Sequence, residues 1–272
     1  MSSSDISRKY GPTALVLGAS EGIGRQFAGE LAARGLDLVL VARDPQALAL
    51  AARELRAAHA VSVSTYSQDL AVADLRPFVT KLCDAHDIGL VVCNAGATHG
   101  AGAFLDQPLD TALRLVQLNC LTPITAAHQL LSRRRGRAAG LVVVSSMSGL
   151  CGSGLVATYA AVKAFQIALC EGLHWELARE GIDVLCAVAG LTDTPAMRRS
   201  GLSFEAAAAK GYAPMQALDV ARGALAQLGV AGVWYAVGQQ AADALRAAPR
   251  TQLTAAMSEA SAALYGIELA RT

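Results

Sequence analysis

The stretch that decides the fold reads Thr13-Ala-Leu-Val-Leu-Gly-Ala-Ser-Glu-Gly-Ile-Gly24, and a helical pattern follows it over residues 25–34. Its first five residues form a short, largely apolar run that predicts a buried strand. Glycines in a strand-to-helix turn let the backbone approach a pyrophosphate, and the free N–H groups at the helix start favour the anion. A second apolar run at 36–42 completes a strand-helix-strand unit. The spacing Gly18-x-x-x-Gly22-x-Gly24 differs from the common Gly-x-Gly-x-x-Gly, so a plain tight turn is the alternative.

Short apolar runs recur along the whole chain. Seven of them are predicted as strands, at residues 13–17, 36–42, 61–67, 90–93, 141–145, 183–188 and 233–237. Several are continuous in Val, Leu and Ile rather than alternating, which is typical of parallel strands covered on both faces. Alanine- and leucine-rich helical segments lie between them. We therefore expect one α/β domain: a doubly wound, parallel, seven-stranded sheet with helices on both faces and a ligand crevice at the carboxyl ends of the strands.

Composition and charge agree with a single globular domain. The chain has 272 residues, of which 53% are hydrophobic and 17% charged, and a net charge of +1 gives no electrostatic case for a nucleic-acid partner. Apolar runs are shorter than the ~18 residues that span a bilayer, and residues 1–10 lack a hydrophobic stretch, so neither a membrane anchor nor a signal peptide is expected. The arginine-rich segment 133–137 is predicted as a solvated helix end.

Cysteines and histidines lack the spacing of disulfide or metal sites. The six cysteines include no Cys-x-x-Cys pair and are expected to be small buried hydrophobic residues of a cytoplasmic protein. The five histidines show no metal-ligand spacing, so no metal site is predicted. His99, which follows the turn Asn94-Ala95-Gly96, is predicted as an ordinary loop residue.

A candidate reaction centre lies in Tyr159-Ala-Ala-Val-Lys163, with Ser146 thirteen residues upstream of the tyrosine. Residues four apart on a helix share a face, so we expect the Lys163 ammonium to lie beside the Tyr159 phenol and to lower its pKa. Such a phenol is a general acid or base near neutral pH. Ser145 competes with Ser146, but side chains on a strand alternate, and the thirteen-residue step favours Ser146. The alternative for the Tyr-Lys pair is an ordinary amphipathic surface.

Six motifs in fixed order resemble the classical short-chain dehydrogenase/reductase family. They are Gly18-x-x-x-Gly22-x-Gly24, Asn94-Ala95-Gly96, Asn119, Ser146, Tyr159-x-x-x-Lys163 and Gly190-x-x-x-Thr194. The resemblance covers about residues 12–240 and implies a Rossmann-type domain, a nicotinamide cofactor and hydride transfer between an alcohol and a carbonyl. Two positions depart from the family pattern: Leu17 stands where a threonine is usual, and Ala189 stands where a proline is usual, which leaves the loop after the sixth strand less constrained.

The resemblance also implies roles for individual residues. Catalytic residues would be Asn119, Ser146, Tyr159 and Lys163, with Asn119 keeping a water relay to Lys163. The implied cofactor-binding residues are Gly18, Ser20, Glu21, Gly22, Ile23, Gly24, Arg43, Asp69, Leu70, Asn94, Ala95, Gly96, Tyr159, Lys163, Gly190, Thr192 and Thr194. Of these, Asp69 and Leu70 would frame the adenine, and the turn at 94–96 would follow the ribose. For Asn119 without the family context, a satisfied core asparagine is the simpler interpretation.

The choice of cofactor is predicted from the end of the second strand, which reads Val41-Ala42-Arg43-Asp44. An acid at this place hydrogen-bonds the ribose of NAD, whereas an arginine accommodates the additional phosphate of NADP. Arg43 presents a planar fork of donors that suits a phosphate. NADP is therefore expected, with Asp44 and NAD as the alternative.

We divide the chain into a polar N-terminal tail at 1–11, the Rossmann-type domain at 12–240 with a substrate lid at about 191–213, and a helical C-terminal extension at 241–272. Helical spacing at 241–247 and 253–264 predicts two helices in that extension, separated at Pro249. The extension is expected either to cover the substrate pocket or to pack against a second subunit.

The lid gives limited information about the substrate. Met197, Phe204 and Tyr212 supply apolar surface, which favours a large hydrophobic carbonyl compound. Arg198 and Arg199 are either solvated or bind a carboxylate, a coenzyme A phosphate or an acyl-carrier protein.

These expectations together describe a cytoplasmic NADPH-dependent carbonyl reductase that acts on a hydrophobic ketone, a 3-oxoacyl compound or the corresponding secondary alcohol. By resemblance, the helices at 113–131 and 159–180 would pair between subunits of a homo-oligomer, a dimer or tetramer. Two alternatives remain: an NAD-linked alcohol dehydrogenase, and a non-enzymatic NADP(H)-binding sensor or scaffold. The complete set of Ser146, Tyr159 and Lys163 argues against the sensor, because a binding module needs no reactive phenol.

Overall fold

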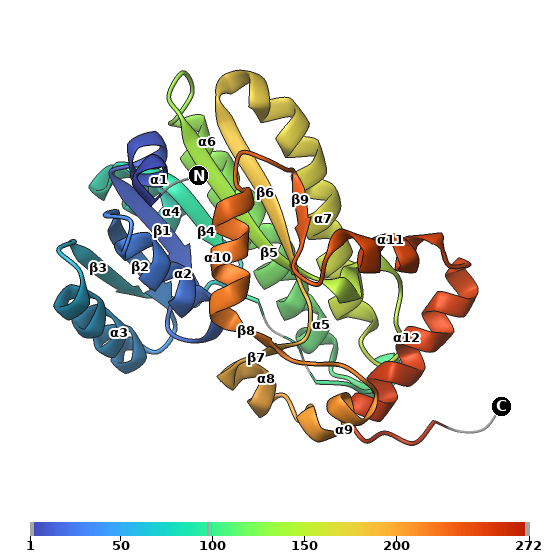
Figure 1. Ribbon diagram of the computed structural model, residues 1–272. Coiled ribbons are helices and arrows are strands. Elements are labelled where there is room, and N and C mark those ends of the chain that lie inside the picture. Colours follow the sequence, from blue (N-terminus) through green and yellow to red (C-terminus); the bar gives the residue numbers. More distant parts are fainter. Residues whose placement is uncertain (1–2, 97, 99, 270–272) are drawn as a thin grey trace.

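The protein contains a doubly wound α/β sheet, as seen in a computed structural model that describes residues 3–96, 98 and 100–269 (Figure 1). Its main sheet has seven parallel strands in the order β3-β2-β1-β4-β5-β6-β9. The strands are β1 (Thr13–Leu17), β2 (Asp37–Ala42), β3 (Val63–Ser67), β4 (Ile88–Cys93), β5 (Ala139–Ser146), β6 (Ile182–Ala189) and β9 (Val233–Tyr235). The predicted single-domain, Rossmann-type fold is confirmed.

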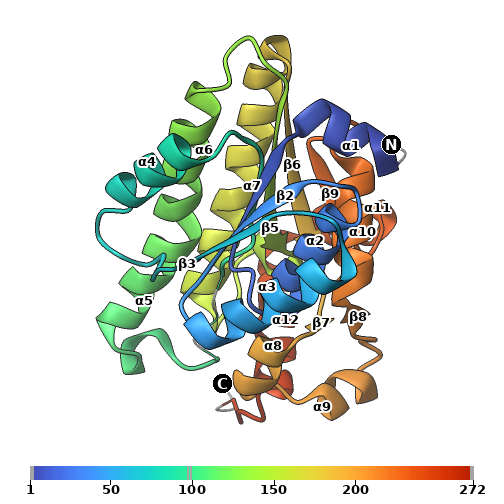
Figure 2. The same cartoon turned by 90° about the vertical axis from the view of Figure 1, so that its left-hand side faces the viewer.

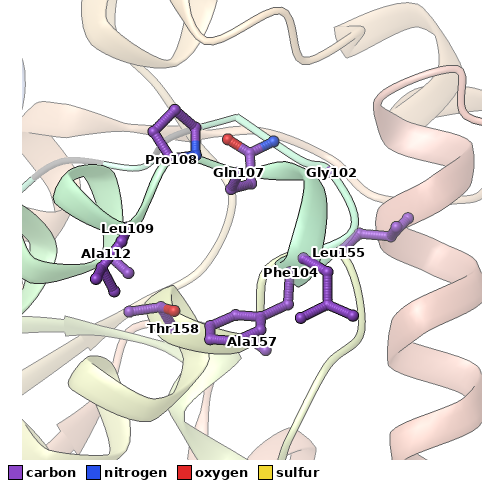
Figure 3. Close-up of a pocket in the computed structure, with 10 residues that line it drawn as sticks. Gly102, Phe104, Gln107, Pro108, Leu109, Ala112, Leu155, Ala157 and Thr158 are labelled. Carbon is purple, nitrogen blue, oxygen red and sulfur yellow. The ribbon is translucent and has the colours of Figure 1, made fainter.

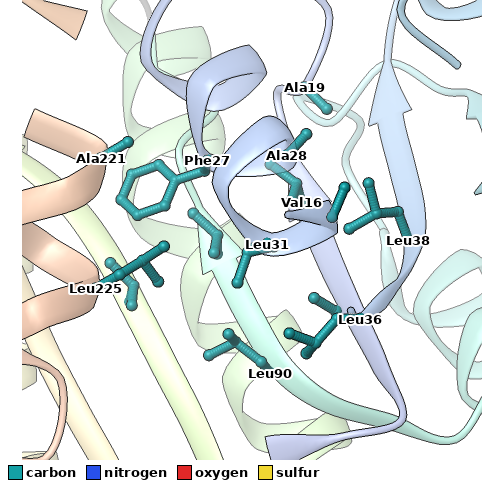
Figure 4. Packing of buried hydrophobic residues seen from close by; sticks show 14 of the residues in the cluster. Val16, Ala19, Phe27, Ala28, Leu31, Leu36, Leu38, Leu90, Ala221 and Leu225 are labelled. Atoms are coloured by element: carbon teal, nitrogen blue, oxygen red, sulfur yellow. The ribbon is translucent and has the colours of Figure 1, made fainter. Parts of the chain in front are cut away.

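Helices cover both faces of this sheet (Figure 2). One layer contains α2 (Gly22–Ala32), α3 (Pro45–Ala58) and α10 (Ala217–Gln227), and the other contains α4 (Arg76–Ala85), α6 (Thr122–Ser132) and α7 (Ala157–Leu177). Each strand contributes side chains to the cores on both faces of the sheet, because successive side chains point to opposite faces. In β1, Ala14 and Val16 join the core under α2, whereas Leu15 and Leu17 join the core under α6 and α7. Figure 4 shows the first of these cores around Phe27.

The N-terminal segment, predicted only as a polar tail, contains helix α1 (Ser3–Tyr10). Ile6 and Tyr10 are 1% and 0% exposed and belong to the core under α2. The Tyr10 hydroxyl donates to Asp183 Oδ2 at 2.5 Å, and Asp183 lies in β6. This segment is therefore docked on the sheet through apolar side chains and through polar contacts of Lys9 and Tyr10 with Asp183.

The helical run predicted at 113–131 is present, but it is not a uniform α-helix. It consists of α5 (Leu109–Val116), a π-helical turn η2 (Gln117–Leu121) and α6. Within η2 the hydrogen bonds span five residues, as in the bond from the Thr122 N–H to the Gln117 carbonyl. A π turn changes the direction of the residues within it and is frequent at functional sites. Asn119 lies in this turn.

The chain crosses the sheet between β3 and β4, where the strand order reverses. β1 pairs with β2 on one side and with β4 on the other, so the helices that follow β1 and β4 lie on opposite faces. This reversal is the place where doubly wound sheets bind ligands, beyond the carboxyl ends of the strands.

Short elements and a helical extension surround that end of the sheet. The lid contains β7 (Thr192–Asp193), α8 (Pro195–Arg199), α9 (Phe204–Ala209) and β8 (Met215–Gln216), and the extension contains α11 (Gln239–Ala247) and α12 (Arg250–Leu264). Three 3-10 turns complete the described elements: η1 (Phe104–Asp106), η3 (Met147–Leu150) and η4 (Ala178–Glu180). The helices predicted at 241–247 and 253–264 are confirmed.

Helix α12 is fixed to the loop after β5. The Gly154 N–H donates to Ser258 Oγ at 2.7 Å, and Ser153 Oγ donates to the Met257 carbonyl at 3.1 Å. The Ser203 N–H of the lid donates to the Leu264 carbonyl at 2.9 Å. The extension thus joins the lid to the loop that follows Ser146.

Two predictions about charged and sulfur-containing residues have different outcomes. The six cysteines are free, and five are buried while Cys83 is partly buried, as expected. The prediction that the arginine-rich segment 133–137 is solvated is wrong for Arg134. This residue is 3% exposed and donates through Nε to the Ile88 carbonyl at 2.6 Å. Among the described helices, none combines the length and apolarity needed to cross a bilayer.

Candidate active site

The glycine turn after β1 packs tightly against the loop after β4. Gly18 has a φ of +87°, and a Cβ at this position would lie 2.7 Å from the Ala95 backbone. A Cβ on Gly24 would lie 1.9 Å from the Gly18 carbonyl oxygen, which itself accepts from Asn94 Nδ2 at 2.9 Å. Only glycine satisfies both the dihedral angle and these close approaches. The predicted partners Gly18, Gly24, Asn94 and Ala95 are therefore brought together.

The start of α2 provides an anion site at this turn. Its N-cap residue, Glu21, is extended and makes no side-chain cap, so the first N–H groups of the helix have no side-chain acceptor from that residue. The Glu21 carboxylate is paired with Arg199 of α8, with 3.0 Å between Oε2 and Nη1. A Cβ on Gly22 would lie 3.1 Å from Thr194 Cγ2, so the lid adjoins the turn. These residues fit a pyrophosphate, because donors converge and the nearby acid is neutralised.

The end of β2 carries the residues expected to select the cofactor. Arg43 is exposed, and the Asp44 carboxylate caps α3 by accepting from the N–H groups of Gln46 and Ala47 at 2.8 and 3.1 Å. Asp44 is therefore already engaged, whereas the Arg43 guanidinium faces solvent. The exposed guanidinium is a planar fork of donors of the kind that binds phosphate, whereas the Asp44 carboxylate is used by the helix cap.

Asp69 and Leu70 lie after β3, near α5 and α6. Burial acts to raise the pKa of Asp69, but hydrogen bonds from Arg114 and from the Ala71 N–H outweigh it and lower that pKa. Arg114 Nη2 lies 2.8 Å from Asp69 Oδ2. Leu70 is buried, and its carbonyl accepts from Thr122 Oγ1 at 2.5 Å. Both residues lie at the same end of the sheet as the glycine turn.

Ser146, Tyr159 and Lys163 converge at the carboxyl end of β5. Ser146 is partly exposed and lies near enough to the Tyr159 phenol to lower its pKa, and the Lys163 ammonium lies 5.7 Å from the centre of the tyrosine ring. Ser145 instead points into the protein and donates to the Lys163 carbonyl at 2.8 Å. The structure therefore places Ser146, rather than its neighbour, beside the phenol.

The expected lowering of the Tyr159 pKa is wrong for the protein itself. Burial raises the pKa of this phenol, the hydrogen bond from Ser146 lowers it in part, and the nearby Tyr265 raises it further. Burial also lowers the pKa of Lys163 to about 8. Desolvation disfavours both charged forms, which is why the ammonium does not produce the acidified phenol that helical spacing suggested.

Lys163 and Asn119 are connected through a residue that the sequence motifs did not identify. Lys163 is 5% exposed, and its Nζ donates to the Val144 carbonyl and to Gln166 Oε1, each at 3.0 Å. Gln166 Nε2 donates to the Asn119 carbonyl at 2.9 Å. The Asn119 side chain donates to the Leu115 carbonyl at 3.0 Å, and no described residue donates to its buried Oδ1.

The remaining predicted residues occupy the rim in different ways. A Cβ on Gly96 would lie 3.1 Å from Asn119 Oδ1 and 3.2 Å from Lys163 Nζ, so the turn at 94–96 borders the reaction centre. Thr192 Oγ1 donates to the Gly190 carbonyl at 3.0 Å, at the start of the lid. Ser20 is partly exposed in the glycine turn, whereas the Ile23 side chain packs on the core. His99 lies outside the described residues.

Two residues near the reaction centre were missed from the sequence. Gln166 follows Lys163 by three positions on α7, so helical spacing was a usable signal. Tyr265 follows α12, and its hydroxyl lies 3.5 Å from Ser200 Oγ of the lid. Nothing local in the sequence connects Tyr265 with Tyr159, since the two are brought together only by the docking of α12.

An apolar pocket opens beside the start of α7 (Figure 3). It is lined by Gly102, Phe104, Leu105, Gln107, Pro108, Leu109, Ala112, Leu155, Ala157 and Thr158. Phe104 and Leu105 are 61% and 91% exposed. Ser146 and Tyr159 are not among the lining residues, so this pocket is a neighbouring surface of α5 and α7 and not the reaction centre.

A doubly wound sheet with this glycine turn at its crevice is typical of Rossmann-type dinucleotide-binding proteins. The chain belongs to the short-chain dehydrogenase family, whose model matches residues 12–203. A 7beta-hydroxysteroid dehydrogenase of Clostridium sardiniense is 31% identical over 226 residues, 83% of this chain and 85% of that protein. A very-long-chain 3-oxoacyl-CoA reductase of Coprinopsis cinerea is 32% identical over 180 residues, 65% of this chain and only 53% of that protein. The chain thus spans about half the length of such reductases.

Solved structures agree with this assignment. A short-chain dehydrogenase of Sphingobium yanoikuyae in complex with NADPH is 32% identical, with a TM-score of 0.77 over 92% of this chain and 97% of that one. A bulky-bulky ketone specific alcohol dehydrogenase of Comamonas testosteroni is 29% identical, with a TM-score of 0.72 over 89% and 96% of the two chains. These relatives are named as oxidoreductases acting on hydroxyl or carbonyl groups.

Proposed function

We propose that this protein is an NADPH-dependent carbonyl reductase that converts a bulky apolar ketone or 3-oxoacyl compound to the secondary alcohol. The observation that carries the proposal is the group of Ser146, Tyr159 and Lys163, in which the serine lies near enough to the phenol to lower its pKa and the ammonium lies 5.7 Å from the centre of the tyrosine ring. A bound nicotinamide coenzyme supplies the hydride. Tyr159 then donates its proton to the developing alkoxide, and Ser146 donates a hydrogen bond to the same oxygen.

The protonation state of the Tyr159 phenol supports the direction of reduction. Burial raises the pKa of Tyr159, so the phenol keeps its proton at neutral pH. A protonated phenol is ready to donate, as carbonyl reduction requires, whereas alcohol oxidation needs the phenolate. Lys163 would hold the ribose of the coenzyme, in the role that the family resemblance implies, and the Asn119 carbonyl would border it through Gln166.

The preference for NADPH is supported by Arg43. Its guanidinium is exposed while the Asp44 carboxylate caps α3, so the available group at the end of β2 is a cation. The Sphingobium yanoikuyae relative was solved with NADPH. Asp69, Leu70 and the turn at 94–96 would contact the adenosine.

The substrate class is supported by the lid and by the relatives. Tyr212 is 45% exposed on the lid, and Met197 and Phe204 add partly buried apolar surface there. The relatives are named as a hydroxysteroid dehydrogenase, a very-long-chain 3-oxoacyl-CoA reductase and a bulky-bulky ketone specific alcohol dehydrogenase, and these names share a long or bulky group beside the reacting carbon. Arg198 is engaged with Asp193 at 2.8 Å and Arg199 with Glu21, so neither offers a free cation for an acidic substrate group.

Titration with NADPH and NADH by fluorescence, followed by a panel of ketones and 3-oxoacyl thioesters, tests the proposal. We expect tighter binding of NADPH and turnover of at least one panel member. Tyr159→Phe should bind NADPH within a few fold of wild type and lose reduction by at least about 10²-fold, since it removes only the proton donor. Tyr66→Phe, outside the crevice, is the matched control. Tight binding without turnover would favour a sensor, and turnover with NADH alone would favour the NAD-linked dehydrogenase.

We further propose that the protein works in the cytoplasm as a homo-oligomer. Six free cysteines suit a reducing compartment. Subunit pairing would use α5, α6 and α7, in line with the family resemblance. Fractionation of the source cells checks the compartment, and recovery of the protein in an exported or membrane fraction would contradict it.

A further inference from the structure

Gln166 connects two parts of the active site through both ends of its amide. It is 1% exposed on α7, three residues after Lys163 and therefore on the same face of the helix. Its Oε1 accepts from Lys163 Nζ at 3.0 Å, and its Nε2 donates to the Asn119 carbonyl at 2.9 Å. One buried side chain thus spans from the ammonium on α7 to the π turn η2.

The Asn119 carbonyl is available for this contact because of the local sequence. In an α-helix it would accept from the N–H of the residue four positions later, and that residue is Pro123, which has no N–H. A buried carbonyl without a donor is unfavourable, because it loses its hydrogen bonds to water without replacement. Gln166 supplies the donor from a neighbouring helix.

The same contacts restrict the ammonium. An ammonium has three N–H donors, and Lys163 gives one to the Val144 carbonyl and one to Gln166 Oε1. The remaining donor is directed by the other two, because the three are fixed in tetrahedral geometry. The direction of the third donor therefore depends on Gln166.

We propose that Gln166 is a positioning residue of the active site. Its side-chain amide holds the Lys163 ammonium beside Tyr159 and connects this ammonium to the Asn119 carbonyl without an intervening water. Its amide occupies the path between these two groups, so a water relay from Lys163 to Asn119 is replaced by a fixed bridge. An amide that donates through nitrogen and accepts through oxygen does not hand on protons as water does. The catalytic consequence rests on the proposed function, whereas the bridge itself does not.

The titration of Lys163 reports directly on this bridge. The titratable groups that face it are Tyr159 on its own helix, Cys120 on η2 and Cys186 on β6. Burial raises the pKa of Cys120 to about 11, so that thiol is neutral near pH 8. Oε1 of Gln166 accepts from the charged form of Lys163 and therefore stabilises it. Loss of this acceptor lowers the Lys163 pKa, and a carboxylate in its place raises it.

Nuclear magnetic resonance with lysine labelled with ¹³C at Cε provides the test. The chain has four lysines, and Lys9, Lys81 and Lys210 are exposed and serve as internal references. We expect the Lys163 pKa to be near 8 in the wild type, to fall by about one unit in Gln166→Met and to rise in Gln166→Glu. Gln129→Met, at a partly buried glutamine of α6, should leave it unchanged. The signals of the three reference lysines show whether Gln166→Met is folded. If the variant is folded and its Lys163 pKa is unchanged, the proposal is overturned.

Kinetics separate a positioning role from a structural one. In Gln166→Met, kcat should fall at least about tenfold with KM changed less than threefold, and the alkaline limb of the pH profile should move to lower pH with the Lys163 pKa. Gln166→Glu, which keeps an acceptor for the ammonium, should recover part of kcat. A fall in kcat without movement of the limb would overturn the positioning role. Absence of turnover in the wild type would count against the proposed function alone, because the titration still tests the bridge.

Discussion

At the scale of single residues, the site is defined by which polar side chains are already engaged. Ser145 is bonded to the Lys163 carbonyl, which leaves Ser146 for the phenol. Asp44 caps α3 through two N–H groups, which leaves Arg43 for a ligand. For each of these two roles the sequence offered two neighbouring residues. A local hydrogen bond engages one of them and leaves the other available.

Arg43→Ala tests the consequence for the cofactor. We expect NADPH binding to weaken by about 1.5–3 kcal/mol, the range for losing a hydrogen bond to a charged group, while NADH binding changes little. Fluorescence titrations with both nucleotides measure the two effects. The control is Arg53→Ala, which removes an exposed arginine of α3 away from the end of β2. Equal weakening of NADPH and NADH would show that Arg43 does not contact the additional phosphate.

The residue scale is also where prediction from sequence was least complete. The six motifs lie at the same end of the parallel sheet, because four of them lie at or directly after the ends of its strands, whereas Asn119 and Tyr159 lie on helical segments that reach the same end. The pKa of Tyr159 was not predictable, since it depends on burial and on Tyr265 from the C-terminal extension. The bridge through Gln166 needed the geometry of η2, which no periodicity reveals.

At the scale of elements, most of the fold follows from local patterns. Every predicted strand begins and ends within two residues of the observed one, because continuous apolar runs bounded by polar turns are a strong signal. The π turn was not predicted, since the side chain that donates to its Asn119 carbonyl, Gln166, lies on α7. The burial of Arg134 was also missed, because its acceptors are the carbonyls of Asp87 and Ile88, which come from a distant segment.

Arg134→Leu tests how far this buried arginine stabilises the sheet. The substitution removes the donors to two main-chain carbonyls near β4, so we expect the free energy of unfolding to fall by about 2–3 kcal/mol. The adjacent Arg135 has a side chain 77% exposed and pairs with Glu180 at 3.6 Å, so Arg135→Leu should change the free energy of unfolding by less than about 0.5 kcal/mol. Urea denaturation measures both. Similar losses in the two variants would contradict a specific role for Arg134.

At the scale of the whole molecule, two cores enclose the sheet while one helical face stays uncovered. On α5, Leu109, Leu113 and Val116 are spaced four and three apart and are 68%, 56% and 38% exposed. An apolar stripe of this kind on a surface helix indicates a buried contact in a larger assembly. The apolar pocket of Figure 3 adjoins the same stripe through Leu109. The position is the one that the family resemblance assigns to subunit pairing.

Leu113→Glu is the corresponding test of assembly. If α5 pairs between subunits, an ionised carboxylate there is desolvated without a partner, which is unfavourable by several kcal/mol, so association should weaken by more than about 100-fold. We expect the wild type to sediment as a dimer or tetramer of the 28.0 kDa chain and the variant to sediment as a monomer. Val230→Glu changes a residue that is 69% exposed in the loop after α10 and should leave the assembly intact. A variant that sediments like the wild type would exclude α5 from the interface, and a monomeric wild type would exclude the homo-oligomer itself.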